Sequence, residues 1–386
     1  MWGDADTRWV PVGEVGEVRM GKQLSPSSRS AGEQYPYLRV ANVLDGYIDY
    51  SDVKTMGFSS AEREVYGLAP GDVLLNEGQS LELVGRSAIY DGAAREFCFQ
   101  NTLVRFRPGS KVLSKYAQAV FKWWLTAGVF AEIAKKTTSI AHLGGDRFAR
   151  LPFPLIPLER QRYIVEALDA VTESERVAQA AIVKLRAIES GALPSLMALQ
   201  RVGDPQSVDR DYVACREIFS LTGGFPLSKA RPNSAGKYPI YGSSGFAGRG
   251  DRVLTGRPTI VIGRVGEGGV GSVRYVAEPA WVTDNALWVE CIEAGWDPEF
   301  VAIYLSWCDL RKLRSQTGQP LITQGAIANV RIPRMSLEEQ GRVIQVAQAW
   351  GEQRILQENE LAKLRILKQA LADDLLSGNV RVNKSA

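Results

Sequence analysis

Residues 157–168, PLERQRYIVEAL, and residues 336–347, SLEEQGRVIQVA, are two copies of one sequence pattern, and they decide the fold. The copies lie 179 positions apart, and the match continues downstream, where Lys184-Leu185-Arg186 falls on Lys363-Leu364-Arg365. Self-similarity at a fixed, long period indicates a duplicated architecture. We therefore expect a globular unit followed by a long helical segment, with both present twice.

Both copies begin a long amphipathic helix. Apolar residues recur at steps of three, four and seven, and residues 159–189 contain neither Gly nor Pro, which corresponds to a helix of about 45 Å at 1.5 Å per residue. Gly191 and Pro194 predict the end of the first helix. Ser336 and Glu339 form a capping-box pattern, which predicts the start of the second helix.

Neither helix can bury its apolar seam against a small globular unit alone. Heptad spacing of such a seam is typical of coiled coils. We therefore expect the two helices to pair with each other as an antiparallel coiled coil. The alternative is that each helix packs only on its own globular unit.

The segments upstream of the helices also correspond, at offsets that shrink along the chain. Glu14-Val15 falls on Glu217-Ile218, and Asn101 is placed on Asn285. Strand-like runs bounded by Gly, Asp and Pro occur in both segments together with one helical pattern. We expect an α+β fold: two pseudo-symmetric globular units, largely antiparallel, separated by two long helices that form the coiled coil. The domains are predicted at 1–156 (first unit), 157–200 (first helix), 201–335 (second unit) and 336–386 (second helix and tail).

The composition excludes several classes of catalyst. The chain has 386 residues, a net charge of +3 and a single histidine, His142, so a His-rich metal site or a two-His motif cannot be built. The four cysteines are far apart, which argues against a zinc ribbon or a disulfide scaffold and favours a reducing cytoplasm. We see no signal-peptide pattern and no apolar run of about 18 residues that predicts a membrane span.

Two local patterns resemble catalytic motifs, and each fails in its context. Residues 266–271 match G-x-G-x-x-G, but a strand pattern follows where a dinucleotide site needs a helix, so we expect a tight hairpin or loop. His142 corresponds to Leu321 in the second copy, so we expect a packing or surface residue rather than a base. We predict no catalytic residue, metal or cofactor site in this chain.

The small net charge hides strong local segregation. Residues 229–274 carry eight bases and two acids, and residues 105–136 carry seven bases and one acid, so each stretch has a charge of +6. Basic stretches of this kind indicate a phosphate-binding surface. Amide and aromatic side chains are interspersed with them, and Arg, Asn and Gln are side chains that read bases. The alternative is an ordinary solvated surface.

Five motifs together resemble the specificity subunit of type I restriction-modification systems. In chain order they are TRWVPVGEVGEVRMGK (7–22), LPFPLIPLERQRYIVEALD (151–169), GRVGEGGVGSV (263–273), VRIPRMSLEEQGRVIQV (330–346) and LKQALADDLLSGNVRV (367–382). They resemble the opening of a target recognition domain, the entries to the family's helices, its glycine-rich segment and its C-terminal signature. The first unit departs from the glycine-rich pattern, since it has NEGQSLELVGR (76–86) there.

The resemblance implies a non-catalytic protein. Each target recognition domain would read one half of a bipartite sequence in double-stranded DNA. The helices would set the spacing and dock two modification subunits, which bind S-adenosylmethionine and methylate adenine at N6. Two restriction subunits would add translocation and cleavage that need ATP and Mg. The resemblance also implies a bacterial or archaeal cytoplasm.

A second hypothesis, of another class, is a coiled-coil scaffold that joins two protein-binding modules without DNA recognition. Under the first hypothesis, the DNA-facing residues are expected in loops beside strand-like runs and in the basic stretches. They are Arg39, Asn42, Asn76, Gln79 and Arg86 in the first unit, and Lys237, Tyr241, Ser243, Arg264 and Arg274 in the second. The helix residues expected to contact partner subunits are Gln161, Arg162, Gln340 and Arg342.

Overall fold

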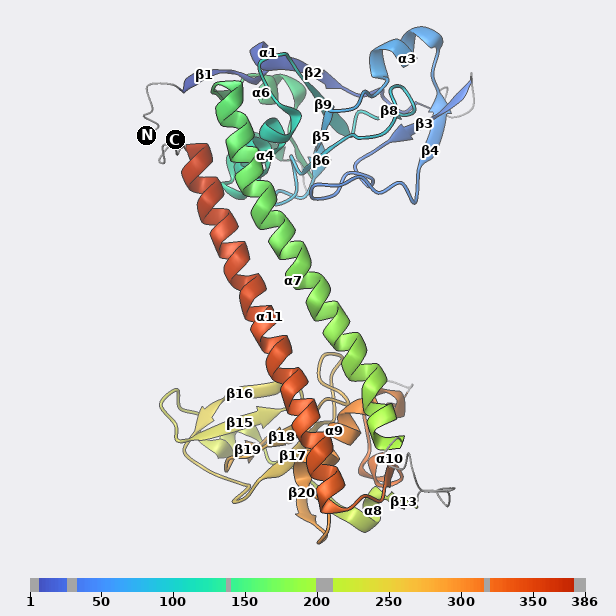
Figure 1. Ribbon diagram of the computed structural model, residues 1–386, viewed down its shortest axis with the longest axis vertical. Helices are drawn as coiled ribbons and strands as arrows, with labels where there is room; N and C mark the ends of the chain where they lie inside the picture. Colours follow the sequence, from blue (N-terminus) through green and yellow to red (C-terminus); the bar gives the residue numbers. More distant parts are fainter. Residues whose placement is uncertain (1–6, 26–32, 137–139, 199–210, 316–319, 378–386) are drawn as a thin grey trace. The chain divides into compact units, whose positions relative to one another are not determined.

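The chain divides into two compact units in the computed structural model (Figure 1). The structure describes residues 7–25, 33–136, 140–198, 211–315 and 320–377, with backbone only for 193–198. Unit 1 combines Met1–Val177 with Leu361–Ala386, and unit 2 is Ala178–Glu360. Each unit therefore contains one globular part and a portion of both long helices. Among the described residues, no helix combines the length and the apolar character needed to cross a membrane.

The globular part of unit 1 is built on two main sheets. β2, β9, β5 and β7 form an antiparallel sheet in that order, and β4, β3 and β8 form a second sheet in which β3 and β8 run parallel. The elements are β1 (Arg8–Pro11), α1 (Val12–Val15), β2 (Gly16–Met20), β3 (Gln34–Leu38), β4 (Lys54–Gly57), α3 (Ser60–Tyr66), β5 (Val73–Asn76), β6 (Gly78–Gln79), β7 (Ser87–Ile89), β8 (Cys98–Phe99), β9 (Leu103–Pro108), α4 (Ser114–Thr126), α5 (Val129–Ile133), β10 (Lys135–Lys136), β11 (Ala141–His142), α6 (Gly145–Ala149) and β12 (Pro152–Leu155).

Unit 2 repeats this plan. β14, β20, β17 and β18 match the first sheet of unit 1, and β16, β15 and β19 match the second, again with one parallel pair, β15 with β19. The elements are β13 (Tyr212–Ala214), α8 (Cys215–Ile218), β14 (Phe219–Gly223), the 3₁₀ turn η1 (Leu227–Ala230), β15 (Tyr238–Gly242), β16 (Gly245–Gly250), β17 (Thr259–Gly263), β18 (Val273–Val276), β19 (Trp281–Val282), β20 (Ala286–Ile292), α9 (Pro298–Trp307), η2 (Leu310–Leu313), α10 (Gln324–Ala328) and β21 (Arg331–Pro333). The predicted α+β class and the pseudo-symmetric duplication are confirmed.

One helix packs on the larger sheet in each unit and forms the core with it. In unit 1, Phe121 of α4 meets Phe106 of β9 edge-on, with ring centroids 5.3 Å apart. In unit 2, Phe300 and Leu305 of α9 are fully buried in one cluster with Ile260 of β17. Removing such large apolar side chains from water is the main driving force of folding.

The predicted alignment of Asn101 with Asn285 is wrong by one residue. Gln100 N–H donates to the carbonyl of Leu38, and Thr283 N–H donates to the carbonyl of Tyr241, at the same place in the two sheets. The register that follows puts Thr102 on Asn285. An alignment shifted by one residue along a strand would match side chains that lie on opposite faces of the sheet.

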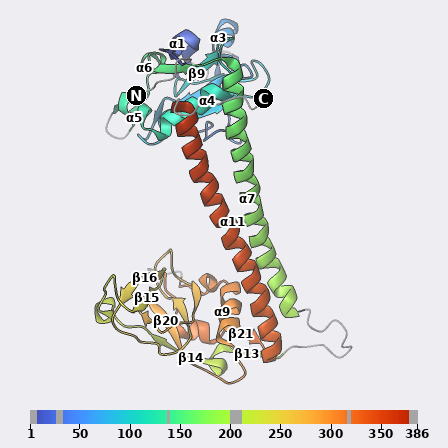
Figure 2. The same cartoon turned by 60° about the vertical axis from the view of Figure 1, so that its left-hand side comes forward.

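The two long helices, α7 (Leu158–Ala198) and α11 (Leu337–Ser377), have 41 residues each. They lie side by side in both views (Figures 1 and 2). In unit 1, Lys368 contacts Glu175 at 2.7 Å. In unit 2, Arg186 pairs with Glu358 at 3.1 Å and Arg354 with Glu189 at 3.3 Å, so the residue numbers rise on one helix as they fall on the other. The antiparallel coiled coil is confirmed, and the alternative of helices packed only on their own units is wrong.

The predicted end of the first helix is wrong, because α7 continues through Gly191 and Pro194 to Ala198. A helical glycine costs about 1 kcal/mol relative to alanine and a proline about 3 kcal/mol, so neither forbids a helix that is already formed on its N-terminal side. The start of α11 is as predicted. Ser336 N–H donates to Glu339 Oε2 (2.7 Å), and Glu339 N–H donates to Ser336 Oγ (3.3 Å), which completes the capping box.

Candidate nucleic-acid interface

A turn and a loop in unit 2 bring together four of the residues expected to face DNA. Tyr241 and Ser243 stand at the β15–β16 turn, and Arg264 and Arg274 flank the glycine-rich loop between β17 and β18. Arg274 ties the two together, because its guanidinium donates to Ser272 Oγ (3.1 Å) and to the carbonyl of Ser244 (3.2 Å). The loop is a hairpin between antiparallel strands, as predicted, and no helix follows it.

Ser243 holds this loop in place and does not face solvent. Its side chain is buried; Oγ donates to the carbonyl of Val265 and accepts the Val265 N–H at 3.3 Å. Short hydroxyl side chains often stabilise loops in this way. The expectation that Ser243 faces DNA is therefore wrong.

A second group of cations gathers at one end of the edge strand β16, around Gly250. The Asn233 N–H donates to the carbonyl of Arg249, and the Arg252 N–H donates to the carbonyl of Ala230, so the segment before β15 lies against β16 and the residues after it. We call the resulting group the basic edge; it consists of Lys229, Arg231, Lys237, Arg249 and Arg252, with Asp251 as the acid of the same segment. Lys237, an expected DNA-facing residue, lies here and is exposed.

In unit 1, two of the expected DNA-facing residues are buried structural groups. Asn42 is 2% exposed; its Nδ2 donates to the carbonyls of Asp49 and Asp52, and its Oδ1 accepts the Arg39 N–H. Asn76 is 0% exposed and donates to the carbonyl of Val43. Both expectations are wrong, because buried side-chain amides that satisfy the backbone are not available to bases.

Arg39 is partly exposed but already neutralised. It pairs with Asp52 at 2.5 Å, and Lys54 contacts the same carboxylate at 2.7 Å. The hydrogen bond from Lys54, together with the charges of Lys54 and Arg39, lowers the pKa of Asp52. Gln79 and Arg86 are both half-buried around the segment that matches the glycine-rich loop of unit 2.

The matching positions of the two loops carry opposite charges. The Leu143 N–H donates to the carbonyl of Glu77, just as the Ile322 N–H donates to the carbonyl of Arg264, so Glu77 occupies the place of Arg264. The Glu77 carboxylate lies 3.0 Å from Nδ1 of His142, whose side chain is 42% exposed. Sequence reasoning did not identify this contact, because Glu77 and His142 are 65 positions apart and the β6–β11 pairing brings them together.

The basic stretch of residues 105–136 is largely paired within unit 1. Its ion pairs are Arg105–Glu17 (3.1 Å), Arg107–Asp72 (2.7 Å), Lys115–Asp169 (2.7 Å) and Lys122–Asp45 (2.9 Å). The hydrogen bonds to Asp72 raise the pKa of the Arg107 guanidinium. Lys111, Lys135 and Lys136 remain exposed. The charge of +6 counted along the sequence therefore overstates the positive charge of this surface.

Two of the four residues expected to contact partner subunits are buried. Gln161 and Gln340 are both 0% exposed, and each binds backbone groups of its own unit through both ends of its amide. They are structural residues, and the expectation for them is wrong. Arg162 and Arg342 are exposed on the helices.

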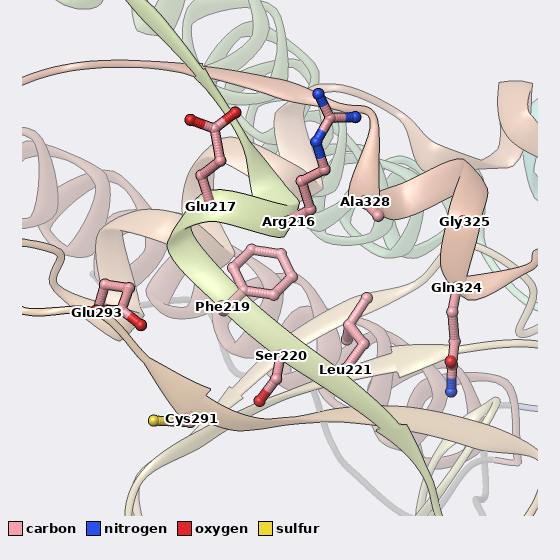
Figure 3. Close-up of a pocket in the computed structure, with 10 residues that line it drawn as sticks. All are labelled: Arg216, Glu217, Phe219, Ser220, Leu221, Cys291, Glu293, Gln324, Gly325 and Ala328. Atoms are coloured by element: carbon pink, nitrogen blue, oxygen red, sulfur yellow. The ribbon is translucent and has the colours of Figure 1, made fainter.

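A separate cavity in unit 2 has no chemistry that points to a ligand. It has a volume of about 360 Å³ between α8, β14, β20 and α10. Figure 3 shows Arg216 and Glu217 on one side of it and Cys291 on another, so the polar groups do not converge. Arg216 donates to Asn329 Oδ1 at 2.9 Å. In the part of the chain that the structure describes, no group of His, Cys, Asp and Glu is arranged to hold a metal ion.

Comparisons with known proteins agree on one family. A family model described as "Type I restriction modification DNA specificity domain" matches residues 6–184 and 208–365. A putative type I restriction enzyme MjaX specificity subunit of Methanocaldococcus jannaschii is 21% identical over 372 residues, which cover 90% of this chain and 88% of that protein.

Two solved structures share the fold. The S subunit of a type I restriction-modification system from M. genitalium has a TM-score of 0.60 at 16% identity, with 97% of this chain and 98% of that chain covered. A chain from a structure on complex assembly and conformational transition of the type I R-M system has a TM-score of 0.64 at 17% identity, with 98% and 99% covered.

Proposed function

This chain belongs to the family of type I restriction-modification DNA specificity subunits, and from that premise we propose that each globular unit reads one half of a bipartite sequence in double-stranded DNA. We further propose that α7 and α11 set the distance between the halves. As a specificity subunit the chain is not itself an enzyme; catalysis lies in partner subunits.

The proposal rests on one observation: the same backbone framework occurs in both units, but equivalent positions of its loops carry different side chains. Matching backbone hydrogen bonds hold Glu77 in unit 1 and Arg264 in unit 2. An arginine donates to guanine, whereas a carboxylate accepts from the amino group of cytosine. Units that share their framework but differ in these groups are suited to reading two unlike half-sites.

The long helices have exposed apolar residues at matching positions of the repeat. Val177 corresponds to Leu356, and Ile188 corresponds to Leu367, in each case 179 positions later. Contiguous patches of exposed apolar side chains mark sites of protein association. Because the positions occur twice, we propose that the helices dock two copies of one partner, the modification subunit.

The proposed division of labour assigns the chemistry to the partners. Two modification subunits bind S-adenosylmethionine and methylate adenine at N6, one on each strand. Two restriction subunits use ATP and Mg for translocation and cleavage. The complex acts where the chromosome lies, in the cytoplasm of a bacterium or archaeon.

The second candidate function is a scaffold that joins two protein-binding modules without DNA. The arrangement of cations favours DNA over this alternative. Five basic residues gather on the basic edge of unit 2, and none of them forms an ion pair within the described residues. Unpaired cations on one surface suit a polyanion.

Methylome sequencing tests the proposal directly. The gene is expressed in a methylation-free host with its modification subunit, with the catalytically dead modification subunit as control. We expect adenine methylation at a single motif of two short halves separated by a fixed gap. If both subunits are soluble and no such motif appears, the proposed function is wrong.

Single variants then assign the halves to the units. Arg264→Ala should relax one position in one half at a cost of about 1–3 kcal/mol, and Gln79→Ala should do the same in the other half. Competition binding with substituted duplexes measures both. If either variant changes positions in both halves equally, the assignment of one half to each unit fails.

A further inference from the structure

The two globular parts hold their cations by different kinds of group. In unit 1, ten basic residues between positions 7 and 136 form ion pairs with carboxylates. Two examples are Arg107 with Asp72 and Lys122 with Asp45. In unit 2, the described part of residues 211–335 contains one such pair, Arg311 with Asp309 at 2.6 Å.

Neutral groups position the cations of unit 2. The ammonium group of Lys229 lies 5.5 Å from the ring centre of Phe225, and that of Lys237 lies 5.3 Å from the ring of Tyr238. Arg249 donates from Nε to the carbonyl of Gly236 at 2.7 Å. Backbone carbonyls and aromatic faces orient a cation without cancelling its charge.

This difference decides which unit can bind phosphates at low cost. A cation held by a carboxylate must give up that ion pair before it neutralises a phosphate, and the carboxylate left behind repels the DNA. A cation held by a ring or a carbonyl keeps its full charge and needs little rearrangement. Counterion release on DNA follows the number of phosphates neutralised.

The basic edge also has a shape suited to a nucleic-acid backbone. β16 is an edge strand of its sheet, and its six residues span about 20 Å at 3.3 Å per residue. Arg249 lies near one end of it, and the guanidinium of Arg274 lies at the turn at the other end. The five cations of the basic edge gather at the Gly250 end of β16. Together with Arg274 at the opposite end they can face several phosphates, because duplex DNA carries one charge per about 1.7 Å of its axis.

We propose that unit 2 supplies most of the sequence-independent phosphate binding of this chain, through the basic edge, and that unit 1 adds little to it. This inference rests on the proposed function. Unit 2 therefore acts as the electrostatic anchor on the duplex, and unit 1 contributes chiefly to the choice of sequence.

The test compares two triple variants of equal charge change in the full complex with its modification subunit. Lys229→Gln, Lys237→Gln and Arg252→Gln remove three exposed cations from the basic edge. Lys111→Gln, Lys135→Gln and Lys136→Gln remove the three exposed lysines of the basic stretch in unit 1 that form no ion pair within the described residues. The dissociation constant for a duplex without the target motif is measured by fluorescence anisotropy at salt concentrations from low to physiological.

We expect the unit 2 triple variant to reduce the magnitude of the slope of log K against log salt by about 2 to 3, since each lost phosphate contact contributes roughly 0.9. Binding should weaken by roughly tenfold or more. The unit 1 triple variant should change the slope by less than half as much. The charge-preserving variant Lys229→Arg with Lys237→Arg should keep the slope, which separates lost charge from damaged folding.

If the two triple variants give equal slopes, or if the unit 1 variant changes the slope more, the proposal that unit 2 supplies most of the phosphate binding is wrong. The proposed DNA recognition is not affected by that result. Absence of any binding by the unsubstituted complex overturns the proposed function, and the anchor with it. Targeted methylation at the unchanged motif by the unit 2 triple variant, at higher enzyme concentration, is the result expected if the basic edge binds phosphates alone.

Discussion

A buried glutamine fixes each long helix to the globular part of its unit. Gln161 Nε2 donates to the carbonyls of Lys111 and Ile156 at 2.8 Å, and its Oε1 accepts the Leu113 N–H at 2.9 Å. Gln340 makes the same three kinds of bond in unit 2. The two glutamines are 179 positions apart and make equivalent bonds, so the duplication preserves individual hydrogen bonds.

Removing either glutamine should destabilise its unit. Gln161→Ala or Gln340→Ala leaves one part-buried N–H, one part-buried carbonyl and one buried carbonyl without that partner, at a cost of about 1–3 kcal/mol. Urea unfolding followed by tryptophan fluorescence measures the effect, and the exposed Gln353→Ala is the control. A change as small as that of the control would show that water replaces the amide and that the glutamine is dispensable.

Which polar residues read bases could not be predicted from the sequence. Asn42, Asn76 and Ser243 lie in loops beside strands, which is where base-reading residues are expected, yet all three are buried. The same short side chains also satisfy loop backbone groups. The two roles have one sequence signature, and the difference depends on burial, which only the folded loop determines.

At the scale of elements, the helices could be predicted and the pairing of short strands could not. Heptad spacing and the Ser336–Glu339 capping box are local signals that packing reinforces. The β6–β11 pairing joins two-residue strands that are more than 60 positions apart, and its propensity signal is too weak to register. For that reason the His142–Glu77 contact lay beyond sequence reasoning.

In each unit, three exposed apolar side chains lie next to an ion pair that joins the two long helices. In unit 1, Val177 follows Glu175, and Ile366 and Leu367 precede its partner Lys368. In unit 2, Ile188 precedes Glu189, and Ile355 and Leu356 follow its partner Arg354. These six side chains are between 38% and 72% exposed. Solvent contact of this kind, repeated in both units, is what two equivalent protein contacts require.

Substituting one group should remove one partner subunit. The double variant Ile366→Ser with Leu367→Ser, or Ile355→Ser with Leu356→Ser, is expected to bind one modification subunit instead of two, because loss of apolar contact area weakens association. Native mass spectrometry gives the stoichiometry, with the exposed Gln353→Ser as control. If both double variants still bind two subunits, the docking surface lies elsewhere.

At the scale of the whole molecule, the net charge of +3 is the sum of two unlike surfaces. Two stretches of +6 look equivalent along the sequence, but the folded chain pairs four of the seven bases in one of them with carboxylates and none of the eight in the other, within the described residues. The duplication could be predicted because it repeats residue by residue. The electrostatic asymmetry could not, because the neutralising acids lie far away along the chain.

The duplication also makes the folding of unit 1 depend on the end of α11. Leu376 is 2% exposed and belongs to the core of unit 1, where Ala372 and Leu375 pack as well. Trp123 Nε1 donates to Asp373 Oδ1 at 2.7 Å, which adds a polar contact between the same two elements. Unit 1 therefore cannot complete its core until residues more than 210 positions after the start of α7 are in place.

Leu376→Ala should accordingly loosen unit 1 and leave unit 2 intact. The substitution leaves a cavity in a closed core and should cost about 2–5 kcal/mol of unfolding free energy. Hydrogen exchange followed by mass spectrometry measures it: peptides from β5 and β9 should lose protection, whereas those from β17 and β20 should not. Ile366→Ala, which truncates a side chain that is 72% exposed on the same helix, is the matched control and should change neither. Equal loss of protection in both units would mean that they unfold as one cooperative structure and that the core of unit 1 is not separately closed by α11.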